Sequence, residues 1–402
     1  MDTGGKIRSY NIVRHLAHNH EVTLLSYYGG RRDTGYEAEI EAEFPGAYTV
    51  HTAALDGSIL AQSLDYLHRV FQFAPFAVAK FTHPDVRHLV ASWLREKRSH
   101  VCVCDFLSAS LNFPDVIAIP TILFQHNVET ALWQRMASTE SNPAKRLAYC
   151  VEAAKMARYE RRALGKFHHV IAVSDNDRQR MLEMDPSCAI SVVPTGVDTH
   201  NSVVAPPSKT NPPRILFTGS MDWEPNIDAV VHFCRDVFPR VRLEFPSAVF
   251  QIVGRSPHAR VRQLASHAVQ VTGTVPSVTD YLRDATVVVV PLRIGGGTRL
   301  KIFEAMAMGK ALVSTTIGAE GLDVRSGHDL ILADDAAAFA DSIALLVRNA
   351  GLRRQYELAA AKLAAQHDWS KIAQRFTGVL QAVRDLAAPN DESRHSRVSG
   401  QL

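Results

Sequence analysis

The sequence has few cysteines, no long apolar run and no strong excess of charge. Its five cysteines are an odd number without compact spacing, which excludes a disulfide framework or a zinc site and fits a reducing compartment. No run approaches the roughly 20 apolar residues that a membrane-spanning helix needs. The opening MDTGGKIRSY also lacks the apolar stretch of a signal peptide. These absences predict a cytoplasmic protein.

The balance of charge excludes a further class. With 44 Lys and Arg against 41 Asp and Glu, the formal net charge is only +3, so we expect no binding of nucleic acid through a basic field. No acidic pair has the spacing of metal ligands, and we predict no metal site. A chain of 402 residues that is 46% hydrophobic can bury more than one core, which favours two domains.

Strand-like apolar runs alternate with segments of helical period along the chain. In the first half the runs are EVTLLSYY, VCVCDF, PTILFQ and HVIAVS, and the helical segment 6–17 has one apolar face. Four prolines lie within residues 206–213, where they block regular structure. After these prolines the alternation of strand-like and helical segments begins again, with the apolar runs RILFTG, FQIVG, VQVTGTV, VVVVPL, ALVSTT and LILADD. Such runs are typical of parallel strands covered on both faces.

The pattern therefore predicts an α/β fold of two tandem Rossmann-like domains that face a central cleft. We place the N-terminal domain at residues 1–205, the linker at 206–213 and the C-terminal domain at 214–368. Residues 369–388 should form a helix that packs back toward the N-terminal domain. The polar tail 389–402 should be disordered.

The most informative stretch is VVVVPLRIGGGTRLKIFEAMAMGKALVST, residues 287–315, which predicts a strand, a glycine loop, a helix and a second strand. Glycines let a ligand approach the backbone closely, and the helix that follows would direct its free amides at an anion. The loop residues concerned are Gly295, Gly296, Gly297 and Thr298. A simple turn remains the alternative for the glycine loop taken alone.

Charged residues follow this loop on the predicted helix. Arg299 and Lys301 would disfavour the helix dipole unless an anion such as a diphosphate compensates them. Glu304 lies three residues after Lys301 and can accept hydrogen bonds from vicinal hydroxyls, such as those of a ribose. Together these residues indicate a nucleoside-diphosphate site, although Lys301 and Glu304 can also form an ordinary surface ion pair.

In the first half, FQHNVE places His126 just past a predicted strand, at the end where ligands bind in open sheets. Asn127 and Glu129 can serve the same site or can cap the following helix. Ser174 is a suitable helix cap with Asp177 three residues on, and we give it a secondary role. Without context, a single His is more often structural.

Taken as a set, GGKIRSYNIVRHLA, FQHNVE, VIAVSDNDR, VVPTGVD, LFTGSMDWEPN and GGGTRLKIFEAMAMG cover nearly the whole chain. With these motifs the sequence resembles the nucleotide-sugar glycosyltransferases of family 4, which have the two-Rossmann GT-B fold. It is most similar to the branch associated with exopolysaccharide and exosortase loci. The resemblance implies a retaining sugar transfer from a nucleotide-diphosphate sugar, without a metal or other cofactor.

The resemblance also implies residue roles. Glu304 matches the second Glu of a Glu-x7-Glu motif that binds the donor ribose, whereas Gly296 stands where the first Glu is expected. Relatives hold the diphosphate with a Gly-Arg followed by a Lys, but here Gly219 is followed by Ser220. We therefore assign the diphosphate contacts to Arg299 and Lys301. A His in the position of His126 reaches the donor sugar in similar enzymes, so these three are the predicted catalytic residues.

Gly4 and Gly5 resemble the N-terminal glycine loop of the family, which lies under the donor diphosphate. Relatives have a central β-strand before that loop, and this chain begins at the loop itself. Deleting a central strand would leave its two neighbours unpaired. We therefore expect the first strand of the N-terminal domain to be missing, either because the start codon is placed too late or because the protein is defective.

The predicted function is transfer of a sugar to a hydroxyl of a glycan or a polyprenyl-linked glycan in bacterial-type polysaccharide biosynthesis. A sugar-nucleotide epimerase of the same fold and a catalytically silent binding protein are the alternatives. Residues 143–166 form a predicted helix with seven cations against two carboxylates. Such a helix can contact anionic lipid at the inner face of the cytoplasmic membrane, or can be an ordinary solvated surface.

Overall fold

The computed structural model describes residues 4–29, 31–52, 74–140, 142–199, 211–294 and 300–387. They belong to two compact units. The first comprises Met1–Arg8 with Pro194–Ile372, and the second comprises Ser9–Val193 with Ala373–Leu402. The linker predicted at 206–213 lies mostly outside the described residues, as does the tail 389–402. The units divide at Val193/Pro194, ahead of the predicted boundary, because residues 194–199 bond within the first unit: Val197 N donates to the carbonyl of His367 at 2.8 Å.

The first unit contains a six-stranded parallel sheet in the order β12-β11-β10-β7-β8-β9. In chain order this is the 3-2-1-4-5-6 arrangement of a doubly wound Rossmann fold. Continuous apolar runs form its centre, and all four valines of β10 are buried. The strands are β7 (Arg214–Thr218), β8 (Val249–Val253), β9 (Val269–Gly273), β10 (Val287–Val290), β11 (Leu312–Ser314) and β12 (Ile331–Leu332).

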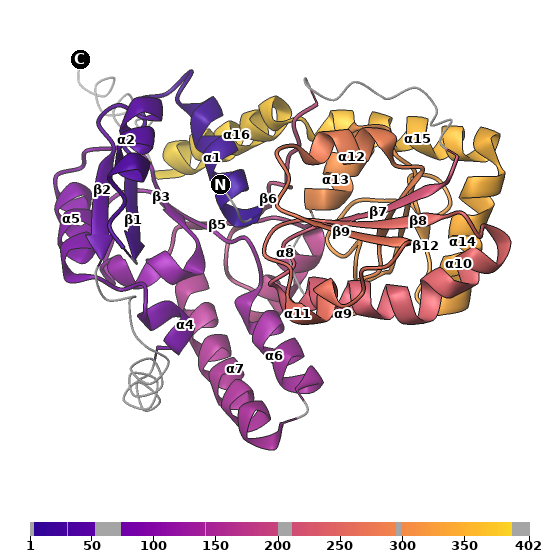
Figure 1. Ribbon diagram of the computed structural model, residues 1–402. Helices are drawn as coiled ribbons and strands as arrows, with labels where there is room; N and C mark the ends of the chain where they lie inside the picture. Colours follow the sequence, from indigo (N-terminus) through magenta and orange to yellow (C-terminus); the bar gives the residue numbers. More distant parts are fainter. Residues whose placement is uncertain are drawn as a thin grey trace, which may run out of the picture. The chain divides into compact units, whose positions relative to one another are not determined.

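Helices cover both faces of this sheet, with α9 and α10 below it and α12 and α13 above it in the view of Figure 1. Crossover helices on both faces explain why the strands are apolar throughout. The helices are α9 (Glu224–His232), α10 (Phe238–Glu244), α11 (Ala259–Arg262), α12 (Val278–Asp284), α13 (Leu300–Ala307), α14 (Ala336–Arg348), α15 (Ala350–Ala364) and the start of α16 (Trp369–Ala387). A π-turn, Phe233–Val237, joins α9 to α10, and a 3-10 turn, Ala365–His367, precedes α16.

The second unit contains a parallel sheet in the order β3-β4-β5-β6 and a separate parallel pair, β1-β2. Among the described residues β1 and β3 are not paired with each other. The strands are β1 (Leu25–Gly29), β2 (Tyr48–Thr52), β3 (Cys102–Asp105), β4 (Thr121–Phe124), β5 (His169–Ala172) and β6 (Ile190–Val192).

The helices of the second unit include the α6–α7 hairpin, whose two members lie side by side in Figure 1. They are most of α1 (Gly4–Leu16), α2 (Thr34–Glu43), α4 (Phe76–Ala79), α5 (Pro84–Arg95), α6 (Glu129–Thr139), α7 (Pro143–Leu164), α8 (Asp175–Met184) and the rest of α16, with a 3-10 turn at Leu107–Asn112. The core contains Cys104, which is fully buried, and burial raises the pKa of its thiol. Cys104 is therefore a small core residue.

Two of the seven cations in residues 143–166 contact other groups of the protein instead of projecting into solvent. Lys155 is buried and pairs with the buried Glu152 at 3.2 Å. Lys166 Nζ donates to the carbonyls of Ser110 and Phe113 at 3.2 and 2.8 Å. Both carboxylates of this segment are buried as well, whereas its other five cations are exposed, so the surface of α7 stays cationic. No helix in the described part of the chain is both long and apolar enough to cross a membrane.

Candidate active site

The strand order of the first unit defines where a ligand should bind. The order reverses between β7 and β10, which are neighbours in the sheet. Ligands of doubly wound sheets bind outside the carboxyl ends of the strands at such a switch point. Here the turn 219–223 follows β7, and the residues leading to α13 follow β10. Gly219 and the helix that carries Lys301 and Glu304 therefore lie at this edge of the sheet.

Lys301 and Gly219 come together at this edge. A Cβ on residue 219 would lie 2.7 Å from Lys301 Nζ, so the ammonium group lies close to the backbone of this glycine. Gly219 also has a φ of 156°, which side chains disfavour. Lys301 Nζ donates to Asn226 Oδ1 at 3.0 Å and lies 4.2 Å from the centre of the buried Phe217 ring. A cation is thus fixed beside the turn after β7.

Glu304 shares the exposed face of α13 with Lys301, one turn further along the helix. Its carboxyl is reachable by solvent but is crowded by surrounding protein atoms, and this loss of hydration raises its pKa, an effect that Lys301 partly opposes. Gly295, Gly296, Gly297, Thr298 and Arg299 lie outside the described residues, so their assignments stay predictions.

In the second unit His126 forms a pair with Asp105. His126 Nε2 lies 2.6 Å from Asp105 Oδ1, and the imidazole is 4% exposed. The pairing follows from the parallel register, because Asp105 is opposite Phe124 and His126 comes two residues later. Both residues therefore emerge at the carboxyl ends of adjacent strands. The contact directs one ring nitrogen toward a carboxylate and so orients the other.

An aromatic ring fixes the plane of His126. The Phe106 ring is stacked on the imidazole, with 3.9 Å between centroids and an interplanar angle of 13°. Phe106 adopts a φ of 71°, which costs a non-glycine residue roughly 1–3 kcal/mol. A strained backbone at this point holds the stacking partner directly after Asp105. Such strain is often found in functional sites.

A buried carboxylate organises the residues that follow His126. Glu160 of α7 accepts the backbone amides of Glu129 and Thr130 at 3.0 and 2.9 Å, and the Gln125 amide at 2.6 Å. Glu160 therefore caps α6, a role that the sequence had offered to Asn127 or Glu129. Asn127 instead donates to the Glu129 carboxyl, whose pKa is raised to about 7 by burial and by the nearby Glu160.

The remaining predicted residues are placed less specifically. Ser174 caps α8: its Oγ accepts the Asp177 amide at 3.0 Å and donates to the Asp177 carboxyl at 2.7 Å. This supports its structural reading. Gly4 and Gly5 form the first turn of α1 and belong to the same compact unit as Gly219.

Sequence reasoning missed Asp105 and Asn226, which bond directly to two predicted site residues. Each lies far from its partner in the chain, by 21 and 75 residues. The available signal was positional, since Asp105 ends one predicted strand and His126 follows the next.

Two family models match the sequence. Residues 3–201 match "Glycosyltransferase Family 4", and residues 212–349 match "Glycosyl transferases group 1". The chain is 29% identical over 259 residues to a phosphatidyl-myo-inositol mannosyltransferase of Mycobacterium leprae, covering 62% of this chain and 67% of that protein. It is 30% identical over 233 residues to the protein of that name from Mycobacterium tuberculosis, covering 54% and 60%. The matches thus span about three fifths to two thirds of these relatives.

Solved structures share the fold at low sequence identity. A glycosyltransferase of Rickettsia africae is 15% identical with a TM-score of 0.66, covering 95% of each chain. Sucrose-phosphate synthase of Thermosynechococcus elongatus is 14% identical with a TM-score of 0.69, covering 96% of this chain and 94% of its own. HepE of Anabaena, solved in complex with UDP, is 14% identical with a TM-score of 0.63, covering 94% and 96%.

The two units have the α/β architecture of solved glycosyltransferases of the GT-B fold. The family models place the chain more narrowly: it belongs to the family 4 glycosyltransferases.

Proposed function

We propose that this protein is a retaining glycosyltransferase that moves a sugar from a nucleotide-diphosphate sugar to a hydroxyl of a glycan or lipid-linked glycan. The observation that carries the proposal is the fixed ammonium of Lys301 beside Gly219 at the switch point, with Glu304 on the same helix face. A cation in that position can bind the donor diphosphate. Glu304 can accept hydrogen bonds from the ribose hydroxyls.

The proposed chemistry transfers one group and one proton. The bond between the anomeric carbon and the diphosphate oxygen breaks while the acceptor oxygen forms a bond on the same face. The acceptor proton passes to the departing diphosphate. Lys301 stabilises the negative charge on that diphosphate. The family resemblance alone proposes His126, which is held by Asp105 in the second unit, as a residue for the sugar. Because the diphosphate takes the proton, we propose that neither a carboxylate nucleophile nor a metal ion is required.

The relatives support the class of ligands. The mycobacterial proteins are named as mannosyltransferases of a phosphatidylinositol, and HepE was solved with UDP. We therefore propose a nucleotide sugar as donor and a glycan or polyprenyl-linked glycan as acceptor, used at the inner face of the cytoplasmic membrane in exopolysaccharide synthesis. The relatives differ in the ligands that they name, so the donor base is left to experiment.

A donor-only reaction tests this proposal without a known acceptor. The protein is incubated with UDP-, GDP- and ADP-sugars in the presence of EDTA and followed by proton NMR. Slow hydrolysis of one donor should release the nucleotide, and the first sugar formed should keep the donor's anomeric configuration. A first product of opposite configuration would contradict the retaining mechanism. Conversion of the donor to an epimer without nucleotide release would favour the epimerase.

A further inference from the structure

The outward face of α7 carries uncharged and cationic side chains and no exposed carboxylate. Its exposed residues follow one another at spacings of one, three or four, which places them on a single stripe along the helix. From the second turn onward they are, in chain order, Leu147, Cys150, Val151, Ala154, Arg158, Arg161 and Arg162. We call this set the α7 stripe. Its first half is apolar, and its second half is made of arginines.

The two carboxylates of α7 lie away from the stripe because each binds backbone amides inside the unit. Glu152 accepts the amide of Phe76 at 2.8 Å and pairs with the buried Lys155. Glu160 accepts two amides at the start of α6. Both glutamates are at most 1% exposed. The fold therefore keeps the negative charge of α7 inside and leaves its positive charge outside.

Cations flank the apolar half of the α7 stripe at both ends. Lys145 and Arg146 are exposed in the first turn of the helix, directly before Leu147, and Arg158 follows one turn after Ala154. Leu147 is 67% exposed and Val151 is 37% exposed. An apolar patch that solvent reaches is thus bounded by basic side chains along the helix.

The helix that carries the stripe is held firmly on its other side. In Figure 1, α6 and α7 lie against each other along the hairpin. Trp133 of α6 packs edge to face against Tyr149 of α7, with 5.9 Å between the ring centroids. Asp185, directly after α8, is close enough to Arg161 for their charges to interact, so the argument uses the other exposed cations. The stripe is therefore a fixed surface of the second unit.

A surface of this composition matches the interface of an anionic lipid bilayer. Exposed apolar side chains can enter the headgroup region, while arginine and lysine bind the phosphates around them. Their long stems let the charged ends stay at the level of the headgroups. A second copy of the chain is a poorer partner for this face, because the same stripe offers no exposed carboxylate to its arginines.

We propose that the α7 stripe, together with Lys145 and Arg146, is a docking surface for membranes that contain anionic phospholipid. The proposal goes beyond the transfer chemistry and does not depend on it. Docking would confine the protein to the plane in which lipid-linked acceptors lie. It would also make binding sensitive to salt, since the attraction of the cations falls off within a Debye length.

Vesicle sedimentation with the full chain tests the proposal. One set of vesicles contains equal amounts of phosphatidylglycerol and phosphatidylcholine, and the other contains phosphatidylcholine alone. The wild type should bind the anionic vesicles at least about 10-fold more tightly, and added salt should weaken that binding. Lys145→Gln/Arg146→Gln/Arg158→Gln should weaken it about 100-fold, because each surface cation contributes about fivefold. Leu147→Gln/Val151→Gln keeps the charge and should weaken it about 10-fold.

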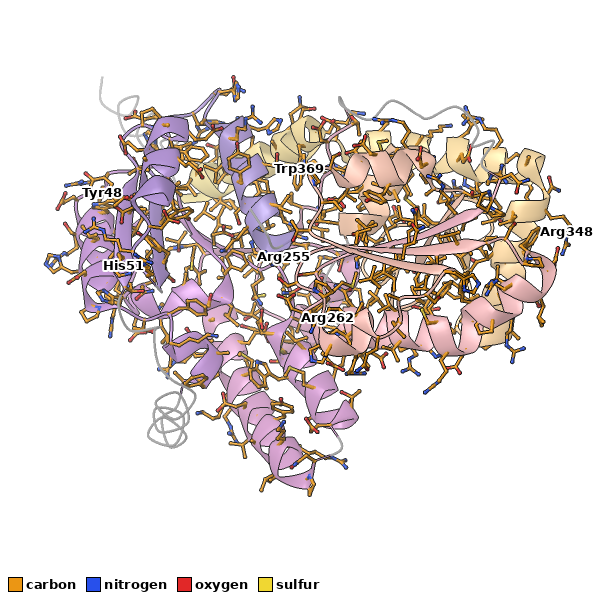
Figure 2. All side chains as sticks on the ribbon, viewed as in Figure 1. Tyr48, His51, Arg255, Arg262, Arg348 and Trp369 are labelled. Atoms are coloured by element: carbon orange, nitrogen blue, oxygen red, sulfur yellow. The ribbon has the colours of Figure 1, made fainter. Side chains whose placement is uncertain are left out.

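A matched control removes the same charge elsewhere. Arg240→Gln/Arg348→Gln/Lys362→Gln changes three exposed cations of the first unit, of which Arg348 is labelled in Figure 2, and it should alter vesicle binding less than about 3-fold. Circular dichroism verifies that each variant is folded. Donor turnover measured without vesicles should be the same in all of them.

Four results would overturn the docking surface. The wild type could bind neither kind of vesicle, or it could bind both equally. The two triple variants could lose binding equally, in which case the charge of the whole molecule would matter rather than this surface. Leu147→Gln/Val151→Gln could bind as tightly as the wild type, which would show that the stripe does not touch the lipid. Absence of donor turnover would contradict the proposed function and leave the docking surface standing.

Discussion

The pairing of Asp105 with His126 allows a quantitative prediction. The carboxylate lies 2.6 Å from His126 Nε2, and the imidazole is almost fully buried. A hydrogen bond that involves a charged group contributes about 1.5–3 kcal/mol. If the pair orients His126 toward the donor sugar, Asp105→Ala should lower kcat about 10- to 150-fold, with a smaller effect on KM. Asp105→Asn keeps an acceptor oxygen and should lose less activity.

The assay is donor turnover measured by nucleotide release, combined with a double-mutant cycle. His126→Ala removes the group that Asp105 orients, so adding Asp105→Ala to it should cost little more. Asp115→Ala, whose side chain is 92% exposed, is the matched control and should behave as wild type. Fully additive losses, or an unchanged kcat in Asp105→Ala, would refute the positioning role.

Three stability predictions follow from other contacts. The pKa of Glu129 is about 7 in the folded protein against an ordinary 4.5, so ionising this carboxyl increasingly destabilises the folded state as the pH rises between these values. Glu129→Gln removes that destabilisation. Urea denaturation should show that it raises the free energy of unfolding by up to about 3 kcal/mol at pH 8 and by about 1 kcal/mol at pH 5. A Cβ on Gly196 would overlap the Trp369 ring, so Gly196→Ala should lower the free energy of unfolding by about 1–3 kcal/mol. Gly378 is a helical residue with open space around it, so Gly378→Ala should raise the free energy of unfolding by about 0.5–1 kcal/mol. Equal thermal midpoints of the two variants would contradict this. Glu160→Ala should cost about 1–3 kcal/mol because it leaves buried amides without an acceptor, and a variant as stable as wild type would disprove the capping role.

The strands of the first unit could be predicted because they are continuous apolar runs. All six runs named for the second half of the sequence form β7 to β12. Two strands of the second unit, β2 and β6, were missed. Tyr48–Thr52 is only partly buried, and Ile190–Val192 has three residues, so neither carries a long apolar signal.

The candidate site was predictable by residue type but not by partner. The sequence indicated His126, Lys301 and Glu304, and the structure supplies the contacts of the first two. Those contacts depend on which strands are neighbours and in which register, and local periodicity carries no such information. Asn226 is the clearest case, because its bond to Lys301 joins residues that are 75 positions apart in the chain.

The central claim is that a nucleoside diphosphate binds at the switch point through Lys301 and Glu304. The most direct measurement is the thermal shift of the wild type, Lys301→Gln and Glu304→Ala with UDP, GDP and ADP, with the exposed Glu244→Ala as control. A ligand at 100 times its Kd adds about 2.7 kcal/mol of stability, enough for a shift of a few degrees. The account predicts that one diphosphate shifts the wild type and the control, and that both site variants lose most of the shift. An undiminished shift in both site variants, or no shift with any nucleotide in the wild type, would contradict it.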